Sequence, residues 1–74
     1  VPANDYINIL ISRQLNSLIH YTFLNSTGQV VLKKQSLNTN EIFDIQDLST
    51  GIYTIQIEGE GLMENIPIMI LKNK

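Results

Sequence analysis

Isoleucine alternates with polar residues along most of this chain, and the alternation limits the folds that the sequence can adopt. In the stretch IYTIQIE (52–58), Tyr53, Ile55 and Ile57 fall on one side of an extended chain and three polar residues fall on the other. A period of two with many β-branched residues is typical of half-buried β-strands rather than helices. The same pattern predicts strands over residues 6–11, 17–24, 29–34, 41–45, 52–58 and 64–72.

Turn-forming residues separate the predicted strands. Residues 25–29 (NSTGQ) contain Gly28 and predict a hairpin connection. Residues 47–51 (DLSTG) end in a glycine, and we expect Gly51 to adopt a positive φ there. A glycine-bracketed EGEG stretch predicts a second hairpin, between the last two strands.

We therefore predict an all-β fold, a small antiparallel immunoglobulin-like β-sandwich of six to seven short strands. Because Pro67 cannot donate a hydrogen bond to a neighbouring strand, we expect the final strand to lie at a sheet edge or to carry a bulge. The 74 residues form one domain, residues 1–74. Since the chain begins with Val1 rather than methionine, we expect it to be part of a longer protein.

Composition excludes several classes of function. Five basic residues against seven acidic ones give a formal net charge of −2, whereas nucleic-acid binding requires a basic surface. No apolar run approaches the roughly 20 residues of a membrane span, so the domain is not expected to be membrane-embedded. The sequence has no cysteine and therefore neither a disulfide framework nor a thiolate metal site.

The side chains that could carry chemistry are few. His20 is the single histidine, which excludes a histidine-paired nucleophile and a multi-histidine metal site. The close acidic pairs Asp44–Asp47 and Glu58–Glu60 fit solvated turns, with weak calcium binding as the alternative. The serines lack the glycine context of a nucleophile elbow. We predict no catalytic residue, no metal and no cofactor.

Tyrosine and lysine allow two further interpretations. Tyr21 and Tyr53 alternate in phase with isoleucine, which favours core packing over a sugar-binding platform. Tyr6 precedes the first apolar run and could be exposed, but one ring makes no platform. Lys72 and Lys74 close the chain, and a solubilising guard on an edge strand explains them without any partner.

The order of four stretches resembles one known family along the entire chain. That family is the C-terminal sorting domain of the type IX secretion system of Bacteroidota, also called the Por secretion sorting domain, in its type A form. The structural motif residues of the resemblance are Pro2, Gly28, Leu48 and Gly51. The four stretches are PANDYINI (2–9), YTFLNSTGQVVLKK (21–34), FDIQDLSTGIYTIQIEGEG (43–61) and IMILKNK (68–74).

The resemblance implies a function without catalysis, at the C terminus of a larger cargo protein. Such a domain directs its cargo from the periplasm through an outer-membrane translocon to the cell surface or the medium. A β-barrel shuttle protein receives the domain, and a sortase commonly removes it and joins the cargo to an anionic lipopolysaccharide. The resemblance assigns partner recognition to Gly51, Tyr53, Ile68, Ile70, Lys72 and Lys74.

Two other expectations concern what the domain binds. The alternative function is a non-catalytic adhesion or carbohydrate-binding module, which would use exposed aromatic rings or a calcium loop. Pairing or swapping of the final edge strand would allow the isolated domain to form a dimer.

Overall fold

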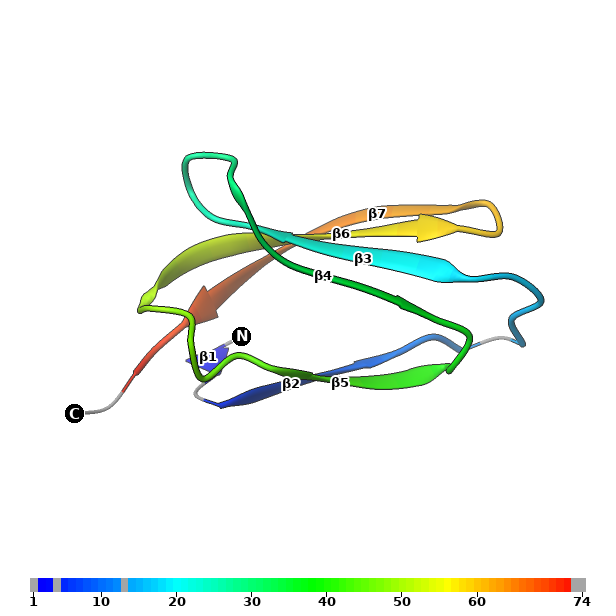
Figure 1. Ribbon diagram of the computed structural model, residues 1–74, viewed down its shortest axis with the longest axis horizontal. Coiled ribbons are helices and arrows are strands. Elements are labelled where there is room, and N and C mark those ends of the chain that lie inside the picture. The colour runs from blue at the N-terminus through cyan, green and yellow to red at the C-terminus, as the bar shows by residue number, and fades with distance from the viewer. Residues whose placement is uncertain (1, 4, 13, 73–74) are drawn as a thin grey trace.

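Seven β-strands form two sheets in the computed structural model, which describes residues 2–3, 5–12 and 14–72 (Figure 1). The described residues contain no helix, which confirms the all-β prediction. Each predicted strand corresponds to an observed one, and the two-residue β1 is an addition. The strands are β1 (Pro2–Ala3), β2 (Tyr6–Leu10), β3 (Ile19–Leu24), β4 (Val30–Ser36), β5 (Asn40–Asp44), β6 (Gly51–Gly59) and β7 (Leu62–Ile70).

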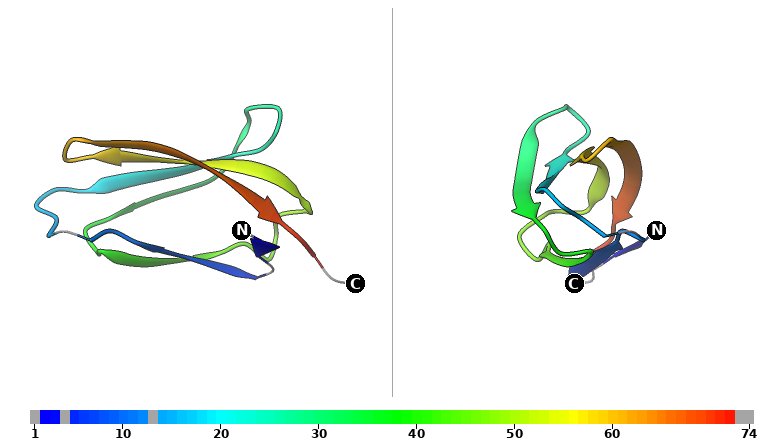
Figure 2. Two further views of the ribbon diagram at one scale, coloured as in Figure 1. Left: turned by 180° about the vertical axis from the view of Figure 1, so that it is seen from behind. Right: turned by 90° about the vertical axis from the view of Figure 1, so that its right-hand side faces the viewer.

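The two sheets lie face to face, as the sandwich prediction requires. The larger sheet has the strand order β1-β7-β6-β3-β4, and the smaller sheet pairs β2 with β5. All pairings are antiparallel except that of β1, which runs parallel to β7. Figure 1 shows the smaller sheet beneath the larger one, and Figure 2 shows the same two layers from behind and end-on.

The core lies between the sheets and is built from the side chains that the alternation placed on one face of each strand. Phe43 of β5 joins the layers, because its ring centroid lies 5.0 Å from that of Tyr21 and 5.1 Å from that of Phe23 in β3. Packing of this kind is the main source of stability in a small domain. The buried hydrophobic residues are Ile19, Tyr21, Phe23, Phe43, Ile45, Tyr53, Ile55, Ile57, Ile68 and Ile70.

The β6–β7 hairpin turns through two residues with positive φ, Glu60 at 48° and Gly61 at 80°. Such a turn matches the twist of the flanking strands. Gly59, which precedes the turn, has a φ of 139°, and a Cβ there would lie 2.8 Å from the carbonyl oxygen of Leu18. Only glycine tolerates both this φ and the close approach of the Leu18 carbonyl oxygen, because it has no Cβ.

The β3–β4 hairpin confirms the turn predicted around Gly28. The Gly28 N–H donates to the carbonyl oxygen of Asn25 at 3.0 Å, and the φ of Gly28 is 85°. The Asn25 side-chain oxygen accepts from the backbone N–H groups of Thr27 and Gln29 at 3.1 and 2.9 Å. Asparagine is common in turns because its side chain bonds to nearby backbone N–H groups, and glycine because it readily adopts a positive φ; both reasons apply here.

Pro67 lies in the part of β7 that β1 leaves uncovered, so the prediction of an edge position is confirmed for this part of the strand. It is paired with Thr54 of β6, and the register between β6 and β7 shows no bulge. The two-residue turn makes Gly59 and Leu62 a hydrogen-bonded pair, and antiparallel pairs alternate from there. The peptide nitrogen of Pro67 therefore faces the free edge, where the missing N–H removes no bond to β6.

A buried carboxylate connects the two sheets, and the sequence alone did not indicate it. Glu41 of β5 is 7% exposed, and its carboxylate lies 2.6 Å from the Lys34 ammonium and accepts from the Ser36 hydroxyl at 2.5 Å. The bond with Lys34 and then the bond with Ser36 lower the pKa of Glu41 to about 2. Burial, and secondarily the charge of Glu41, raise the pKa of the nearby Tyr21 hydroxyl.

Candidate functional site

The connection from β5 to β6 forms a compact corner, residues 45–53, that contains the LSTGIY motif. The Leu48 N–H donates to the carbonyl oxygen of Ile45 at 3.0 Å and closes the first turn. The Tyr53 hydroxyl then donates to the carbonyl oxygen of Ser49 at 2.8 Å, while its ring is buried. A tyrosine hydroxyl bonded to the backbone a few residues upstream is also found at a sheet-to-sheet corner of immunoglobulin domains. The predicted core packing of Tyr53 is confirmed.

The prediction of a positive φ at Gly51 is wrong. The glycines with positive φ in the described chain are Gly28, Gly59 and Gly61, whereas Gly51 is the first residue of β6 and pairs with Ile70. The chain has already reversed direction upstream of Gly51, so this position takes ordinary strand geometry. A Cβ there would lie 3.7 Å from the nearest atom, in the Tyr53 ring, which is ordinary contact.

The segment that follows β7 is attached to this corner through Lys72. The Lys72 ammonium donates to the carbonyl oxygen of Ile45 at 2.7 Å, and its backbone N–H donates to the Thr50 hydroxyl at 3.0 Å. Lys72 therefore lies against the corner. Lys74, the other predicted recognition lysine, lies outside the described residues.

The N-terminal segment reaches the same end of the sandwich. Pro2 and Ala3 pair with Met69 and Ile70 at the end of β7. The Ile45 N–H donates to the carbonyl oxygen of Asp5 at 2.8 Å. Figure 1 shows β1, the start of β6 and the end of β7 together at this end of the molecule. We call this region the corner end and define it as residues 2–3, 45–53 and 69–72.

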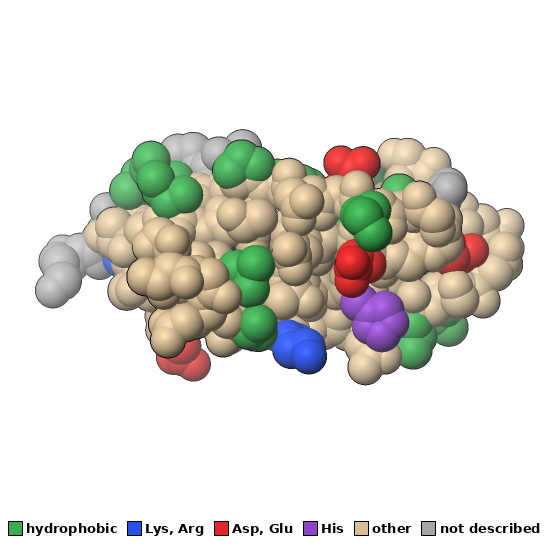
Figure 3. Space-filling model, turned by 90° about the horizontal axis from the view of Figure 1, so that it is seen from above, with side chains coloured by type: hydrophobic (Ala, Val, Ile, Leu, Met, Phe, Trp, Pro, Cys, Tyr) green, Lys and Arg blue, Asp and Glu red, His purple; other side chains and the backbone are tan. Residues whose placement is uncertain are grey.

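The predicted recognition residues differ in exposure. Ile68 and Ile70 point into the core and are 9% and 0% exposed, so their side chains are not presented to a partner. Ile52, Met69 and Leu71 are exposed instead. Ile52 pairs with Met69, and a shallow hollow of about 250 Å³ lies beside this pair. Figure 3 looks onto this outer face of the larger sheet and shows hydrophobic side chains over the end where β6 begins.

Three of the four structural motif residues of the resemblance lie at the corner end, and Gly28 does not. Leu48 is half-buried in the corner, next to Gly51 and Tyr53 in the chain, and Pro2 belongs to the strand that joins the corner end. Gly28 lies in the β3–β4 hairpin and belongs to a separate turn.

The structure gives little support to sugar binding. Tyr21 and Tyr53 are 1% and 5% exposed, as predicted, and both phenylalanines are buried. Among the residues that the structure describes, Tyr6, at 58%, is the single exposed aromatic ring. An aromatic platform would need more than one exposed ring.

The predicted turn carboxylates have structural partners. The Asp44 side chain accepts from the backbone N–H of Gln46 at 2.9 Å. Glu60 accepts from the backbone N–H groups of Asn16 and Ser17 at 2.5 and 3.1 Å, and so joins the β6–β7 hairpin to the loop before β3. Within the described chain, no three His, Asp or Glu side chains gather as metal ligands would.

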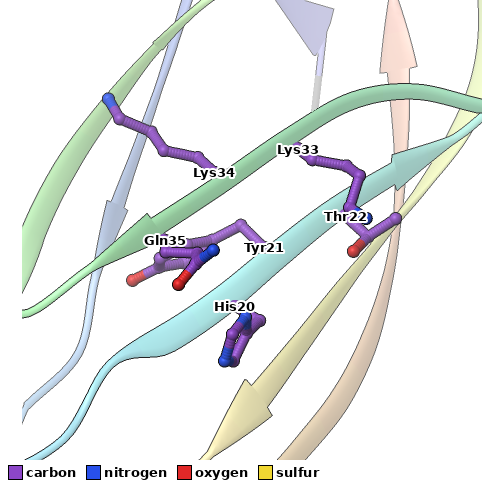
Figure 4. Close-up of a pocket in the computed structure, with 6 residues that line it drawn as sticks. All are labelled: His20, Tyr21, Thr22, Lys33, Lys34 and Gln35. Atoms are coloured by element: carbon purple, nitrogen blue, oxygen red, sulfur yellow. The ribbon is translucent and has the colours of Figure 1, made fainter.

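A second hollow, of about 490 Å³, lies along the paired strands β3 and β4 (Figure 4). His20 is exposed here. Lys34 also borders the hollow, but its ammonium is engaged with Glu41. The full lining comprises His20, Tyr21, Thr22, Lys33, Lys34 and Gln35.

No helix among the described residues has the length and apolar character needed to cross a membrane.

Comparison with known proteins identifies the family. Comparisons with curated proteins and with solved structures found no match. The family model described as the secretion system C-terminal sorting domain matches residues 1–70. The chain therefore belongs to this family of type IX secretion signals, whose members send proteins across the outer membrane to the cell surface or the extracellular space and interact with the secretion machinery.

Proposed function

We propose that residues 1–74 are a type A sorting domain at the C-terminal end of a larger Bacteroidota cargo protein. Four stretches in the family's order support the type, and the family match over residues 1–70 supports the single-domain assignment. The domain acts without catalysis, because its sorting role is recognition by other proteins.

We propose that the machinery recognises the corner end. One observation carries this proposal: the Lys72 ammonium and the corner carbonyl of Ile45 are in contact at 2.7 Å, so the segment after β7 and the corner form one surface. Tyr53, Ile68 and Ile70 shape that surface from inside, because they are buried beneath it.

The exposed side chains Ile52, Met69 and Leu71 supply the contact area, and they lie beside the buried residues that the resemblance singled out. Gly51 contributes as the first residue of β6, where it pairs with Ile70 at the end of β7. The resemblance also assigns partner recognition to Lys74, which lies outside the described residues.

The proposed partners are the outer-membrane translocon, a β-barrel shuttle protein that receives the domain, and a sortase that removes it. The domain passes through the periplasm before it reaches the surface. A partner strand could add to the free edge of β7 between the turn and Pro67, where the peptide groups of Met63 and Asn65 face outward. The same edge allows two isolated copies to pair as a dimer.

The experiment is an export assay with a secretable reporter. The reporter carries a periplasmic signal peptide and residues 1–74 at its C terminus, in a Bacteroidota host. We compare Leu71→Ser at the corner end with Leu18→Ser beside Gly59 at the opposite end of the sandwich, because both leucines are exposed, at 42% and 44%. We expect Leu71→Ser to lower the exported fraction and Leu18→Ser to leave it unchanged. Equal export of both variants would contradict recognition at the corner end.

A further inference from the structure

The backbone of Ile45 is a junction between three parts of the chain. Its N–H donates to Asp5 of the N-terminal segment at 2.8 Å. Its carbonyl oxygen accepts from the Leu48 N–H of the corner at 3.0 Å and from the Lys72 ammonium at 2.7 Å. The Ile45 side chain is fully buried, so the core holds this junction in place. A group bonded to the Ile45 carbonyl is therefore fixed relative to the core.

Two hydrogen bonds attach Lys72 to the corner, one through its side chain and one through its backbone. Its ammonium reaches the Ile45 carbonyl oxygen, and its backbone N–H is bonded to the Thr50 hydroxyl at 3.0 Å. A hydrogen bond from a charged donor is stronger than one between neutral groups. Two anchors in one residue restrain both the side chain and the direction in which the backbone leaves β7.

We propose that Lys72 is a positioning residue that sets the direction of the C-terminal segment against the corner. This inference rests on the proposed recognition of the corner end and names how that end is kept in shape. The Lys72 charge serves a bond inside the domain, and the exposed Leu71 side chain is the group that it presents to the secretion machinery. The proposal differs from attraction of the lysine to an acidic receptor, for which only the charge would matter.

A positioning role and a charge role of Lys72 predict different results for a substitution at Thr50. Thr50→Val removes the acceptor for the Lys72 N–H and leaves every charge in place, whereas Lys72→Gln removes the ammonium. If positioning is the role, both substitutions release the same segment and their effects overlap in the double variant. If charge is the role, only Lys72→Gln affects recognition.

The experiment combines export with amide hydrogen exchange. The variants are Lys72→Gln, Thr50→Val and the double variant, with Lys33→Gln as the control, because Lys33 is an exposed lysine of β4 outside the corner end. We expect about threefold lower export for each single variant and no further loss in the double variant. We also expect about tenfold faster exchange of the residue 72 amide in both single variants, without faster exchange in the β3 and β6 core strands. The control should match the parent in both measurements.

Several outcomes would overturn the proposal. Export of Thr50→Val at the parent level together with loss in Lys72→Gln would assign a charge contact instead. Unchanged exchange at residue 72 in both variants would show that the two bonds do not restrain the segment. If the parent fusion itself is not exported, the proposed recognition fails, while the exchange result still decides whether Lys72 restrains the segment.

Discussion

The Tyr53 hydroxyl donates to the Ser49 carbonyl oxygen at 2.8 Å and closes the corner between the two sheets. Tyr53→Phe should lower the free energy of unfolding by about 1 kcal/mol, because it removes this bond and leaves the packing intact. Tyr53→Ala should cost about 3 kcal/mol through the lost ring. Urea unfolding followed by circular dichroism measures both.

Tyr21→Phe is the matched control. The buried Tyr21 hydroxyl has no hydrogen-bond partner among the described residues, so its removal should change the free energy of unfolding by less than about 0.5 kcal/mol or raise it. Equal losses in Tyr21→Phe and Tyr53→Phe would contradict a specific role for the corner bond.

The glycines Gly59 and Gly51 should respond oppositely to a methyl group. Gly59→Ala should lower the free energy of unfolding by about 2 kcal/mol or more, because its φ is 139° and the added Cβ would meet the Leu18 carbonyl oxygen at 2.8 Å. Gly51→Ala should leave it unchanged or raise it by about 0.5 kcal/mol, because the site has strand geometry and space. Thermal melts of the two variants test this prediction. A larger loss of stability in Gly51→Ala than in Gly59→Ala would contradict strand geometry at Gly51.

The buried Glu41 should make the domain sensitive to acid. Its pKa in the folded protein is about 2, below the ordinary value of 4.5, so its stabilisation is complete above about pH 4.5 and is lost as the pH falls toward 2. Because the partner Lys34 side chain is 42% exposed and partly screened by water, we expect a loss of about 1–2 kcal/mol over that window. Urea unfolding at a series of pH values measures it.

Glu41→Gln separates this carboxylate from the other acidic groups. The variant should be less stable than the parent at pH 7, and the difference should shrink between about pH 4.5 and pH 2. Glu58→Gln removes an exposed carboxylate on the outer face of β6 and should keep the pH dependence of the parent. Parallel pH profiles for Glu41→Gln and the parent would show that Glu41 does not carry the effect.

Pro67 should limit pairing between copies at the free edge of β7. Pro67→Val supplies the missing N–H on that edge, so it should shift the isolated domain toward dimers or larger species. Sedimentation velocity over a concentration series measures the shift, with Asn65→Val as a control that adds the same side chain without a new N–H. An unchanged distribution in Pro67→Val, or equal shifts in both variants, would contradict the role of the proline.

The sequence predicted the strands and the core well because period-two alternation directly records which side chains are buried. Tyr53, Ile55 and Ile57 all face the core as the pattern indicated. Gly51 was misplaced because glycine fits both a turn and the first position of a strand, and only the path of the chain separates these possibilities.

Features that depend on distant partners had no local signal. The two-residue β1 pairs with the end of β7, and the partners of Glu41 come from β4 in the opposite sheet. The sequence analysis assigns Lys72 to an edge guard or to partner recognition, but its bonds are to Ile45 and Thr50 in the corner. Such contacts follow from topology, which the alternation of residues does not encode.

The most direct test of the account is whether this domain alone makes export depend on the type IX translocon. Because Ile68 and Ile70 belong to the core, a deletion of residues 68–74 would also unfold the domain, so the measurement compares whole domains. The secretable reporter, with and without residues 1–74, is expressed in a type IX-competent Bacteroidota host and in a strain that lacks the translocon, and the fraction at the cell surface and in the medium is measured. We predict export only where the domain and the translocon are both present, with the folded fusion retained in the periplasm of the deficient strain. Export that is equal in the two strains, or retention of the fusion in both, would contradict the account.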